Sequence, residues 1–263
     1  LSFWRGLGTE YMMGFCPEQH TTADVVRHAI IPQSASNRCS LSEVFNNGRP
    51  VRPKRMITHN WRNRFRDLLA AAIADALDEC EFGIITYFLS NDVDKLEEMI
   101  RLAGKLHQTY WICAICVSQH DSICDKTFGG KDTVTGIPYP VCNCGKTKIL
   151  NDTPPILHDG RSIECELNKF SDMMTYLAYT DSEFEQVVAV DASFGLFWRA
   201  WCMSELARGD AMFIPQHLKI ISRSALENHR DSLRSLRVED MQATRNEDIE
   251  GILSEIRDKD AFN

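Results

Sequence analysis

The stretch that decides the fold is residues 196–208, which read LFWRAWCMSELAR. In a helix, five of these side chains follow one another at helical spacing and share one continuous face: Trp198, Trp201, Cys202, Glu205 and Leu206. Four of the five are large or apolar, so this face is predicted to pack against the core. A carboxylate in its middle is costly unless it is paired, hydrogen-bonded or directed into a cleft.

Two interpretations of Glu205 follow from this position. It can be a structural glutamate that caps a neighbouring backbone or pairs with Arg199 or Arg208. It can instead be a functional carboxylate at the floor of a pocket. The residues alone leave both interpretations open.

The segment before this helix favours a pocket. Residues 185–191, EQVVAVD, read as a buried strand, with Asp191 and Ser193 at its carboxyl end. Ligands of α/β proteins tend to bind beyond the carboxyl ends of the strands. A single cleft that contains Asp191, Ser193 and Glu205 is therefore predicted.

A second strand and helix open the α/β pattern earlier in the chain. Residues 55–58 read as a short buried strand, and a long helix follows from Phe65 to Leu77, with Asn60 or Asn63 as its N-cap. The polar turn between them is a second candidate ligand-binding segment, although a histidine in such a turn is more often structural. Its three candidate residues are His59, Asn60 and Trp61.

The middle of the chain predicts further core elements. Residues 83–89 read as a strand or a buried connection, and residues 92–105 as a helix. Residues 109–117, TYWICAICV, are typical of a central parallel strand. Because neighbouring side chains of a strand alternate between faces, Cys113 and Cys116 are predicted to point apart and belong to the core.

From residue 118 to residue 164 the periodicity disappears and glycine and proline recur, which indicates an irregular insert. A loop of this length usually has a function or is held in place by a cross-link such as a metal site. Soft ligands for a structural Zn²⁺ are present at five positions: His120, Cys124, Cys142, Cys144 and Cys165. Free buried thiols and a disulfide are the alternatives.

The two ends of the chain are predicted to extend this domain. Residues 24–31 read as a short helix that ends before Pro32, and residues 49–55 as an extended basic linker. Toward the other end the pattern predicts a helix, a strand and two further helices, over residues 165–179, 217–221, 224–236 and 247–257. The predicted organisation is an N-terminal extension (1–54), an α/β domain (55–222) and a C-terminal helical extension (223–263).

Bulk composition narrows the function classes. A net charge of −8 argues against binding to nucleic acid, and no apolar run approaches the ~20 residues that span a bilayer. Ten cysteines in a chain with many helical stretches do not fit a small secreted disulfide scaffold. We expect a reducing intracellular compartment: the cytoplasm, or an organelle if a targeting segment preceded Leu1.

Three stretches carry a resemblance to a known family. Residues 201–206, WCMSEL, resemble the W-C-x-x-E-L helix of Toll/interleukin-1 receptor (TIR) domains and TIR-like proteins, including those expanded in unicellular algae. Residues 111–119, WICAICVSQ, resemble the W-I-D-x-x-C-I-N-Q strand of the related heterokaryon-incompatibility-type domains. Residues 56–61, MITHNW, resemble their first strand and turn. The resemblance covers about residues 55–222.

This resemblance implies a flavodoxin-like three-layer α/β sandwich with a parallel sheet, interrupted by the Cys-rich insert. In the NAD-cleaving members of the family the glutamate is catalytic, which implies NAD⁺ as substrate and Glu205 as the catalytic residue. The other expected ligand contacts are His59, Asn60, Trp61, Asp191, Ser193 and Trp201.

A rival hypothesis is a non-catalytic TIR-like scaffold or peripheral subunit, which would have a protein partner or associate with itself. It is motivated by Arg199, which stands where many enzymatic members have a small hydroxyl residue, and by the insert, which is not a usual TIR feature. A zinc-dependent hydrolase is a weaker alternative, because four protein ligands leave no open position on the metal.

Overall fold

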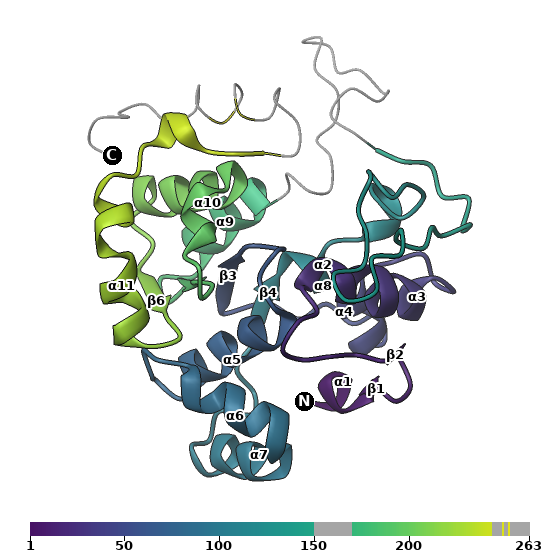
Figure 1. Cartoon of the computed structure of the whole chain (residues 1–263), viewed down its shortest axis with the longest axis horizontal. Helices are drawn as coiled ribbons and strands as arrows, with labels where there is room; N and C mark the ends of the chain where they lie inside the picture. Colours follow the sequence, from purple (N-terminus) through teal and green to yellow (C-terminus); the bar gives the residue numbers. More distant parts are fainter. Residues whose placement is uncertain (150–169, 244–248, 250–251, 253–263) are drawn as a thin grey trace. The chain divides into compact units, whose positions relative to one another are not determined.

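The chain forms two compact units in a computed structural model that describes residues 1–149, 170–243, 249 and 252 (Figure 1). Unit 1 comprises Leu1–Pro53 and Trp111–Met173, and unit 2 comprises Lys54–Tyr110 and Met174–Asn263. The predicted N-terminal extension and the predicted Cys-rich insert therefore lie in the same unit. None of the described helices combines the length and the apolarity needed to cross a bilayer.

A parallel sheet forms the centre of unit 2. Strand β3 (Arg55–His59) pairs with β5 (Glu185–Ala189), and β5 pairs with β6 (Gln216–Lys219), all in parallel. The strand order is β4-β3-β5-β6, and the chain leaves unit 2 within β4 (Tyr110–Ile112). Strands β3 and β5 are the two central strands of this order, and their carboxyl ends are adjacent.

Helices cover both faces of this sheet. Thr58 and Gln186 contact α10 (Ala200–Ala211), so their face of the sheet lies under that helix. Side chains alternate along a strand, and the opposite face meets α5 (Phe65–Ala76), whose Asp75 forms ion pairs with Arg55 and Lys219. The remaining described helices of unit 2 are α6 (Gly83–Asn91), α7 (Val93–Leu102), α9 (Phe170–Thr180, whose first turn belongs to unit 1), η4 (Gly195–Trp198), α11 (Arg223–Arg234) and η5 (Val238–Asp240).

Unit 1 consists of short helices and irregular chain. Its regular elements are α1 (Ser2–Gly6), β1 (Leu7–Gly8), β2 (Met12–Met13), α2 (Thr22–Val25), η1 (Val26–Ile30), α3 (Ile31–Ser34), α4 (Leu41–Phe45), α8 (Cys113–Cys116) and η2 (Gln119–Asp121). The described part of the predicted insert, residues 118–149, has only η2 and one isolated β-bridge, Lys131 to Pro138. Its irregular character is confirmed.

Several predicted elements are confirmed. The strands at residues 55–58, 185–191 and 217–221 correspond to β3, β5 and β6. The helices predicted from residues 65, 92 and 224 correspond to α5, α7 and α11, and residues 170–179 of another predicted helix lie in α9. The α/β class with a parallel sheet is therefore established.

The strand or buried connection predicted over residues 83–89 is wrong, because this segment forms helix α6. Ile85 and Leu89, four residues apart, are buried, whereas Ile84 and Tyr87 are exposed. This is the burial pattern of a surface helix. Tertiary packing therefore decides the conformation of this short apolar segment.

The central strand predicted over residues 109–117 is also wrong. Strand β4 ends at Ile112 and stands at the end of the sheet order, and the next four residues form helix α8. Cys113 and Cys116 therefore lie on one helical turn rather than on opposite faces of a strand. Both are half-buried instead of belonging to the core.

Two predicted helix boundaries need correction. The helix through residues 24–31 continues past Pro32 into α3, because it passes through the π-turn η1, in which the Ile31 N–H bonds to the Val26 oxygen. A π-turn shifts the bonding register, so proline's missing N–H and its ring are accommodated. The N-cap of α5 is Arg64, neither Asn60 nor Asn63.

The helix that contains Glu205 begins later than predicted. Trp198 lies in the 3₁₀ turn η4, and α10 starts at Ala200. Cys202 and Leu206 are buried in the core of unit 2, as expected, and Trp201 packs half-buried against that core. Most of the predicted final helix (247–257) lies outside the described residues.

Candidate functional site

The carboxyl group of Glu205 is bound by a threonine of the sheet. Thr58 lies in the fourth position of β3, is completely buried, and donates its hydroxyl to Glu205 Oε2 at 2.6 Å. No ion pair to Glu205 is present among the described residues. Arg208 donates to the Thr175 hydroxyl at 3.1 Å. The pairing of Glu205 with Arg199 or Arg208 is therefore not seen.

Two glutamines fix the direction of the bond from Thr58. Gln186 Nε2 donates to the Thr58 hydroxyl at 2.8 Å and to the Glu205 backbone oxygen at 3.2 Å. Gln216 Nε2 in turn donates to Gln186 Oε1 at 2.9 Å. Because the Thr58 oxygen already accepts a proton from Gln186, its single hydroxyl proton is directed at Glu205.

Burial dominates the electrostatics of this carboxyl group. It raises the pKa of Glu205 to about 8, and the hydrogen bond from Thr58 opposes this shift only in part. At neutral pH the group is therefore mostly protonated. A carboxyl group that changes its charge near neutrality can hold or release a proton, which is the property required of a catalytic acid or base.

Asp191 organises the loop that follows β5. Its carboxylate accepts the N–H groups of Ser193, Gly195 and Leu196, at 3.2, 2.8 and 2.7 Å, and the Ser193 hydroxyl at 2.5 Å. These bonds hold the loop while Phe194 adopts a left-handed conformation, with φ of 58°. The lone pairs of Asp191 are thus used within the loop.

The loops after β3 and β5 meet at Gly195. A Cβ atom on this glycine would lie 3.4 Å from Asn60 Nδ2 and 3.3 Å from both Asp191 Oδ1 and Ser193 Oγ. Asn60 Oδ1 also accepts the Arg62 N–H at 3.0 Å, which fixes the turn after β3. Three predicted ligand contacts, Asn60, Asp191 and Ser193, are therefore brought together at the carboxyl end of the sheet.

His59 is buried at the same end of β3. Its Nδ1 lies 3.2 Å from the Ile57 oxygen, and burial lowers the pKa of His59 to about 4. The ring is therefore neutral at neutral pH. The remaining two predicted contacts, Trp61 and Trp201, are half-buried.

Glu205 and Asp191 belong to separate hydrogen-bond networks. Thr58, the partner of Glu205, stands opposite Val188 in the sheet. Asp191 lies three residues further along the chain, which corresponds to ~10 Å of strand. Glu205 therefore lies over the middle of the strands, whereas Asp191 and Ser193 lie at their ends.

Unit 1 contains a four-residue cluster that could hold a metal ion. The ligand atoms of His120, Cys124, Cys142 and Cys144 all lie within 4.8 Å of one another. Cys124 Sγ is 3.7 Å from Cys144 Sγ, and Cys142 Sγ is 3.8 Å from His120 Nδ1. A disulfide requires about 2.05 Å between sulfurs, so Cys124 and Cys144 are not bonded to each other.

The surroundings of the cluster suit a metal-bound histidine. Burial, together with the charges of Lys148 and Lys146, lowers the pKa of His120, so its ring is neutral at neutral pH. Lys148 also donates to the His120 backbone oxygen at 2.8 Å. The fifth predicted ligand, Cys165, lies outside the described residues, and four predicted ligands converge without it.

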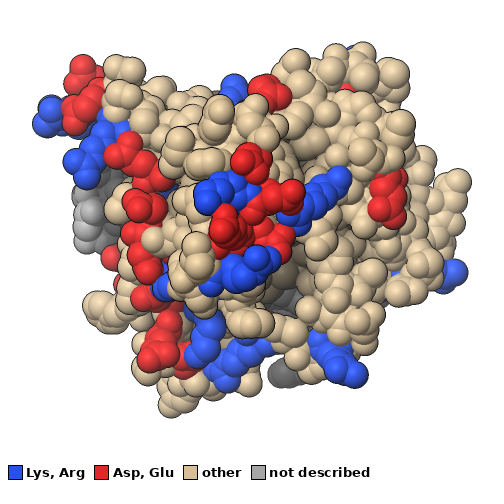
Figure 2. Space-filling model, turned by 90° about the horizontal axis from the view of Figure 1, so that it is seen from below, with Lys and Arg blue, Asp and Glu red and all other residues tan. Residues whose placement is uncertain are grey.

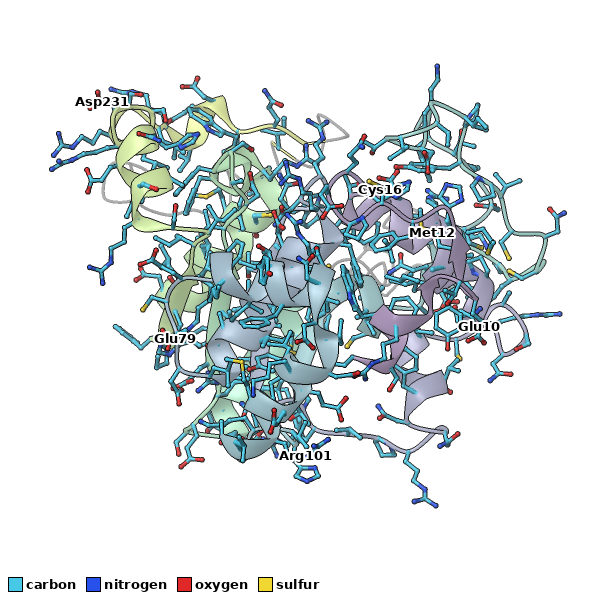
Figure 3. All side chains as sticks on the ribbon, turned by 60° about the horizontal axis from the view of Figure 1, so that its bottom comes forward. Glu10, Met12, Cys16, Glu79, Arg101 and Asp231 are labelled. Atoms are coloured by element: carbon cyan, nitrogen blue, oxygen red, sulfur yellow. The ribbon has the colours of Figure 1, made fainter. Side chains whose placement is uncertain are left out.

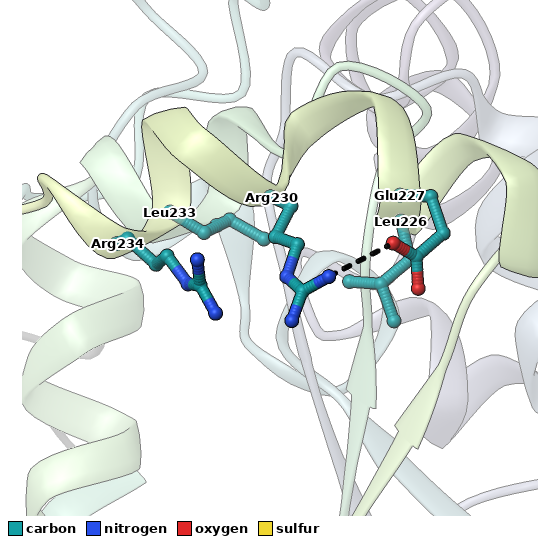
Figure 4. A pocket seen from close by; sticks show the side chains of 5 residues that line it. All are labelled: Leu226, Glu227, Arg230, Leu233 and Arg234. Atoms are coloured by element: carbon teal, nitrogen blue, oxygen red, sulfur yellow. Dashed lines mark ion pairs between the residues drawn. The ribbon is translucent and has the colours of Figure 1, made fainter.

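None of the predicted site residues lines the hollow on α11. Figure 4 shows its lining: Leu226, Glu227, Arg230, Leu233 and Arg234. Arg230 forms an ion pair with Glu227 at 3.7 Å across one helical turn. The hollow contains no arrangement of acid, base and nucleophile, so we assign it no chemistry.

Charges of both signs are mixed on the surface near α7. Ion pairs join Lys95 to Glu98 and Arg101 to Glu97, each at 2.8 Å. Figure 2 likewise shows acidic and basic side chains interspersed on one face of the molecule. Mixed charges of this kind are typical of a solvated protein surface and differ from a basic nucleic-acid interface.

Sequence reasoning missed several residues of these networks. Thr58 donates to the Glu205 carboxyl group, Gln186 donates to Thr58, and Gln216 donates to Gln186. Arg62 follows Asn60 in the turn after β3. The sequence does contain a signal for Thr58 and Gln186, because each is a polar residue in a strand predicted to be buried. A buried polar side chain needs a hydrogen-bond partner, so each of them indicates a second polar group nearby.

Comparisons with protein-family models, curated proteins and solved structures found no match to this chain. Its function is therefore inferred from its own residues and their geometry.

Proposed function

We propose that residues 55–222 form a TIR-like domain that hydrolyses the bond between nicotinamide and ribose in NAD⁺, with Glu205 as the essential carboxyl group. The strand order β4-β3-β5-β6 supports the fold part of this proposal. Numbered along the domain, it reads 2-1-3-4, the beginning of the flavodoxin-like order 2-1-3-4-5. The resemblance of residues 201–206 to the catalytic helix supports the rest.

The observation that carries the proposal is the state of the Glu205 side chain. It is half-buried, it accepts a hydrogen bond from Thr58, and no basic side chain among the described residues neutralises it. A structural carboxylate at such a position would be expected to have a cationic partner. A carboxyl group without a cationic partner in the protein is suited to stabilise the positive charge of a substrate.

The reaction requires a group that stabilises positive charge. As the C1′–N bond breaks, its electron pair leaves with nicotinamide, and the ribose becomes an oxocarbenium-like cation. Water adds to C1′ and releases a proton. The ionised carboxylate of Glu205 would hold the ribose hydroxyls and stabilise this cation. Trp61 and Trp201 would stack on rings of the substrate, with His59 and Asn60 as secondary contacts.

The test is the release of nicotinamide from NAD⁺ by the full chain, measured by chromatography. Glu205→Gln is expected to abolish the release while retaining the fold, which thermal unfolding checks. Glu79→Gln, the same chemical change at an exposed position of unit 2 (Figure 3), is expected to match the wild-type protein. Equal turnover by the wild-type protein and Glu205→Gln would remove the carboxylate from the mechanism.

The pH profile gives a second test of the same role. The carboxylate is the active form, so kcat/KM should rise with pH and level off above the free-protein pKa of Glu205, about 8. A bound nicotinamide cation favours the carboxylate, so the midpoint for kcat should lie at a lower pH than that for kcat/KM. A profile that falls between pH 6 and 8 contradicts this role.

We further propose that the cluster in unit 1 binds a structural Zn²⁺. Tetrahedral zinc with Zn–S of about 2.3 Å places two sulfurs about 3.8 Å apart. The 3.7 Å between Cys124 and Cys144 fits this spacing. Four protein ligands fill a tetrahedral zinc ion, so the ion would hold the irregular chain together rather than activate water.

Elemental analysis should find one zinc ion per chain. A strong chelator should lower the melting temperature, and Cys144→Ser should lose the metal. Cys80→Ser, at an exposed cysteine outside the cluster, should retain it. A metal-free protein that melts at the same temperature with and without chelator would end the zinc proposal.

A second candidate function, a non-catalytic scaffold, is favoured by the outer face of α6. Ile84 and Tyr87 lie one helical turn apart and are 61% and 58% exposed. Exposed apolar side chains that adjoin one another are typical of protein-binding surfaces. This function predicts no nicotinamide release from wild-type protein, and concentration-dependent association that Ile84→Lys weakens.

A further inference from the structure

We propose that Arg62 and Arg199 form a binding site for the phosphate group of a small soluble ligand, at the carboxyl ends of β3 and β5. The inference stands on these two arginines and does not depend on the hydrolysis assigned to Glu205.

Arg199 carries a buried cationic nitrogen without an acceptor. Its side chain is half-buried, and its Nη1 atom is buried with no hydrogen-bond partner among the described residues. Neither an ion pair nor a side-chain cap of α10 involves this guanidinium there. An unsatisfied charged donor is destabilising, and an anion that supplies an acceptor relieves that cost.

Arg62 places a second positive charge beside the first. It is exposed at the turn after β3, and no acidic side chain pairs with it among the described residues. Burial lowers the pKa of Arg199, and the charge of Arg62 lowers it further, so the two guanidinium groups repel each other. Neither guanidinium group forms an ion pair among the described residues, so both positive charges are available to an anion.

The two loops that carry these arginines are held in place. Asn60 Oδ1 accepts the Arg62 N–H at 3.0 Å, so the first loop is fixed at that residue. Asp191 binds the backbone of the second loop as far as Leu196, and the Arg199 N–H bonds to the Leu196 oxygen at 3.1 Å. A site built on fixed loops loses little conformational entropy when it binds a ligand.

The topology of the sheet points to the same place. In the order β4-β3-β5-β6, chain connections leave β3 and β5 toward opposite sides of the sheet, since β4 lies beyond β3 and β6 beyond β5. Ligands of open parallel sheets bind at the carboxyl ends of such a strand pair. Arg62 follows β3 and Arg199 follows β5. The twelve-residue helix α10, which begins directly after Arg199, adds the positive end of its dipole.

Phosphate is the anion whose chemistry fits this arrangement. A guanidinium group presents paired N–H donors that match two phosphate oxygens, and two such groups balance a doubly charged phosphate. The phosphate could belong to the free inorganic ion or to an ester such as a nucleoside diphosphate, and the two sources require separate measurements.

The test is a thermal-shift titration of the full chain with inorganic phosphate and, separately, with ADP, at ionic strength held constant with sodium chloride. The wild-type melting temperature is expected to rise to a plateau with at least one of the two. Arg199→Gln should melt at or above the wild-type temperature without phosphate and show no rise with it. Arg199→Lys, which retains the charge but not the paired donors, should bind about tenfold more weakly.

Arg62→Gln and Arg101→Gln complete the comparison. Arg62 is exposed, so its substitution should leave the fold unchanged and weaken binding about tenfold, even if Arg199→Gln fails to fold. Arg101 lies on the exposed face of α7 (Figure 3), so the Arg101→Gln variant should behave as the wild-type protein. Saturation by ADP at lower concentration than by phosphate assigns the ester as ligand. No saturable shift with either anion, or equal shifts in wild type and Arg62→Gln, overturns the proposal.

Discussion

The Ser34 hydroxyl group favours a proton on one nitrogen of His120, Nε2. The Ser34 hydroxyl donates to the Ile30 oxygen at 2.8 Å, and its oxygen lies 3.0 Å from His120 Nε2. Because the single hydroxyl proton is already used, Ser34 accepts a hydrogen bond from His120 Nε2–H. The lone pair of the neutral ring is then on Nδ1, the nitrogen that lies 3.8 Å from Cys142 Sγ.

Ser34→Ala should therefore weaken metal binding although Ser34 is not a ligand. Without the acceptor at Nε2, the ring loses its orientation and preferred tautomer, and such changes lower metal affinity about 10- to 100-fold. Competition with a coloured chelator measures this affinity. Ser36→Ala, at an exposed serine nearby in the chain, is the control. Identical affinities in the two variants would contradict the orienting role.

Gly209→Ala should destabilise unit 2. A Cβ atom at this position of α10 would lie 2.0 Å from Gln186 Oε1 and 2.6 Å from Gln216 Nε2. Alanine gains about 1 kcal/mol of helix propensity over glycine, but overpacking of this kind costs about 1–3 kcal/mol or more and displaces the glutamines. Urea unfolding measures the difference. A variant as stable as the wild-type protein would show that the two glutamines can move without cost.

The stability of the protein should fall with rising pH across the titration of Glu205. Burial raises the folded-state pKa to about 8 from an ordinary value of 4.5, so between these pH values the folded protein binds the extra proton. The contribution of this group is present below pH 4.5 and is lost as the pH rises through 8. Relative to the wild-type protein, Glu205→Gln should melt higher at pH 9 than at pH 5. A difference that does not change with pH would place the folded-state pKa near its ordinary value.

Asp75→Asn should be strongly destabilising. Asp75 is 1% exposed and forms ion pairs with Arg55 and with Lys219 (3.2 Å), and it accepts a hydrogen bond from the Tyr110 hydroxyl at 2.8 Å. Removal of its charge leaves Lys219 without its carboxylate partner and Arg55 with Glu185 alone, a loss of about 3–5 kcal/mol.

The matched control for this change is Asp78→Asn, whose carboxylate pairs with Lys105 at the surface. An exposed pair of this kind contributes less than about 1 kcal/mol. Chemical unfolding of both variants measures the difference in the free energy of unfolding. Similar losses in the two variants would show that the ion pairs of Asp75 do not stabilise the fold.

The sequence predicted correctly those elements whose spacing of apolar residues matches the side chains that are buried in the structure. In β5 the apolar run is bounded by polar residues, and in α5 the apolar residues recur at helical spacing, so local and tertiary preferences coincide. The cluster of His120, Cys124, Cys142 and Cys144 was found for a different reason. Thiol and imidazole groups in a segment without a core of its own indicate a metal even when the path of the chain is unknown.

The elements that it misplaced depend on contacts that no local pattern contains. Gly83 bonds through its N–H to the Ile221 oxygen at 3.0 Å, and α6 begins there. The chemistry around Glu205 is similarly non-local, since Thr58 lies 147 positions away. Periodicity indicated that the carboxylate faces inward, but only the fold shows that a threonine, rather than an arginine, receives it.

The pairing of β3 with β5 has a consequence for biosynthesis. Arg55 stands opposite Glu185, so the two strands are 130 positions apart in the sequence (185 − 55 = 130). The growing polypeptide must therefore expose the first strand until another 130 residues, about half of the chain, have been synthesised. Until β5 has been synthesised, the edge of β3 is unpaired and can associate with other chains. We expect chaperones to occupy that edge during translation.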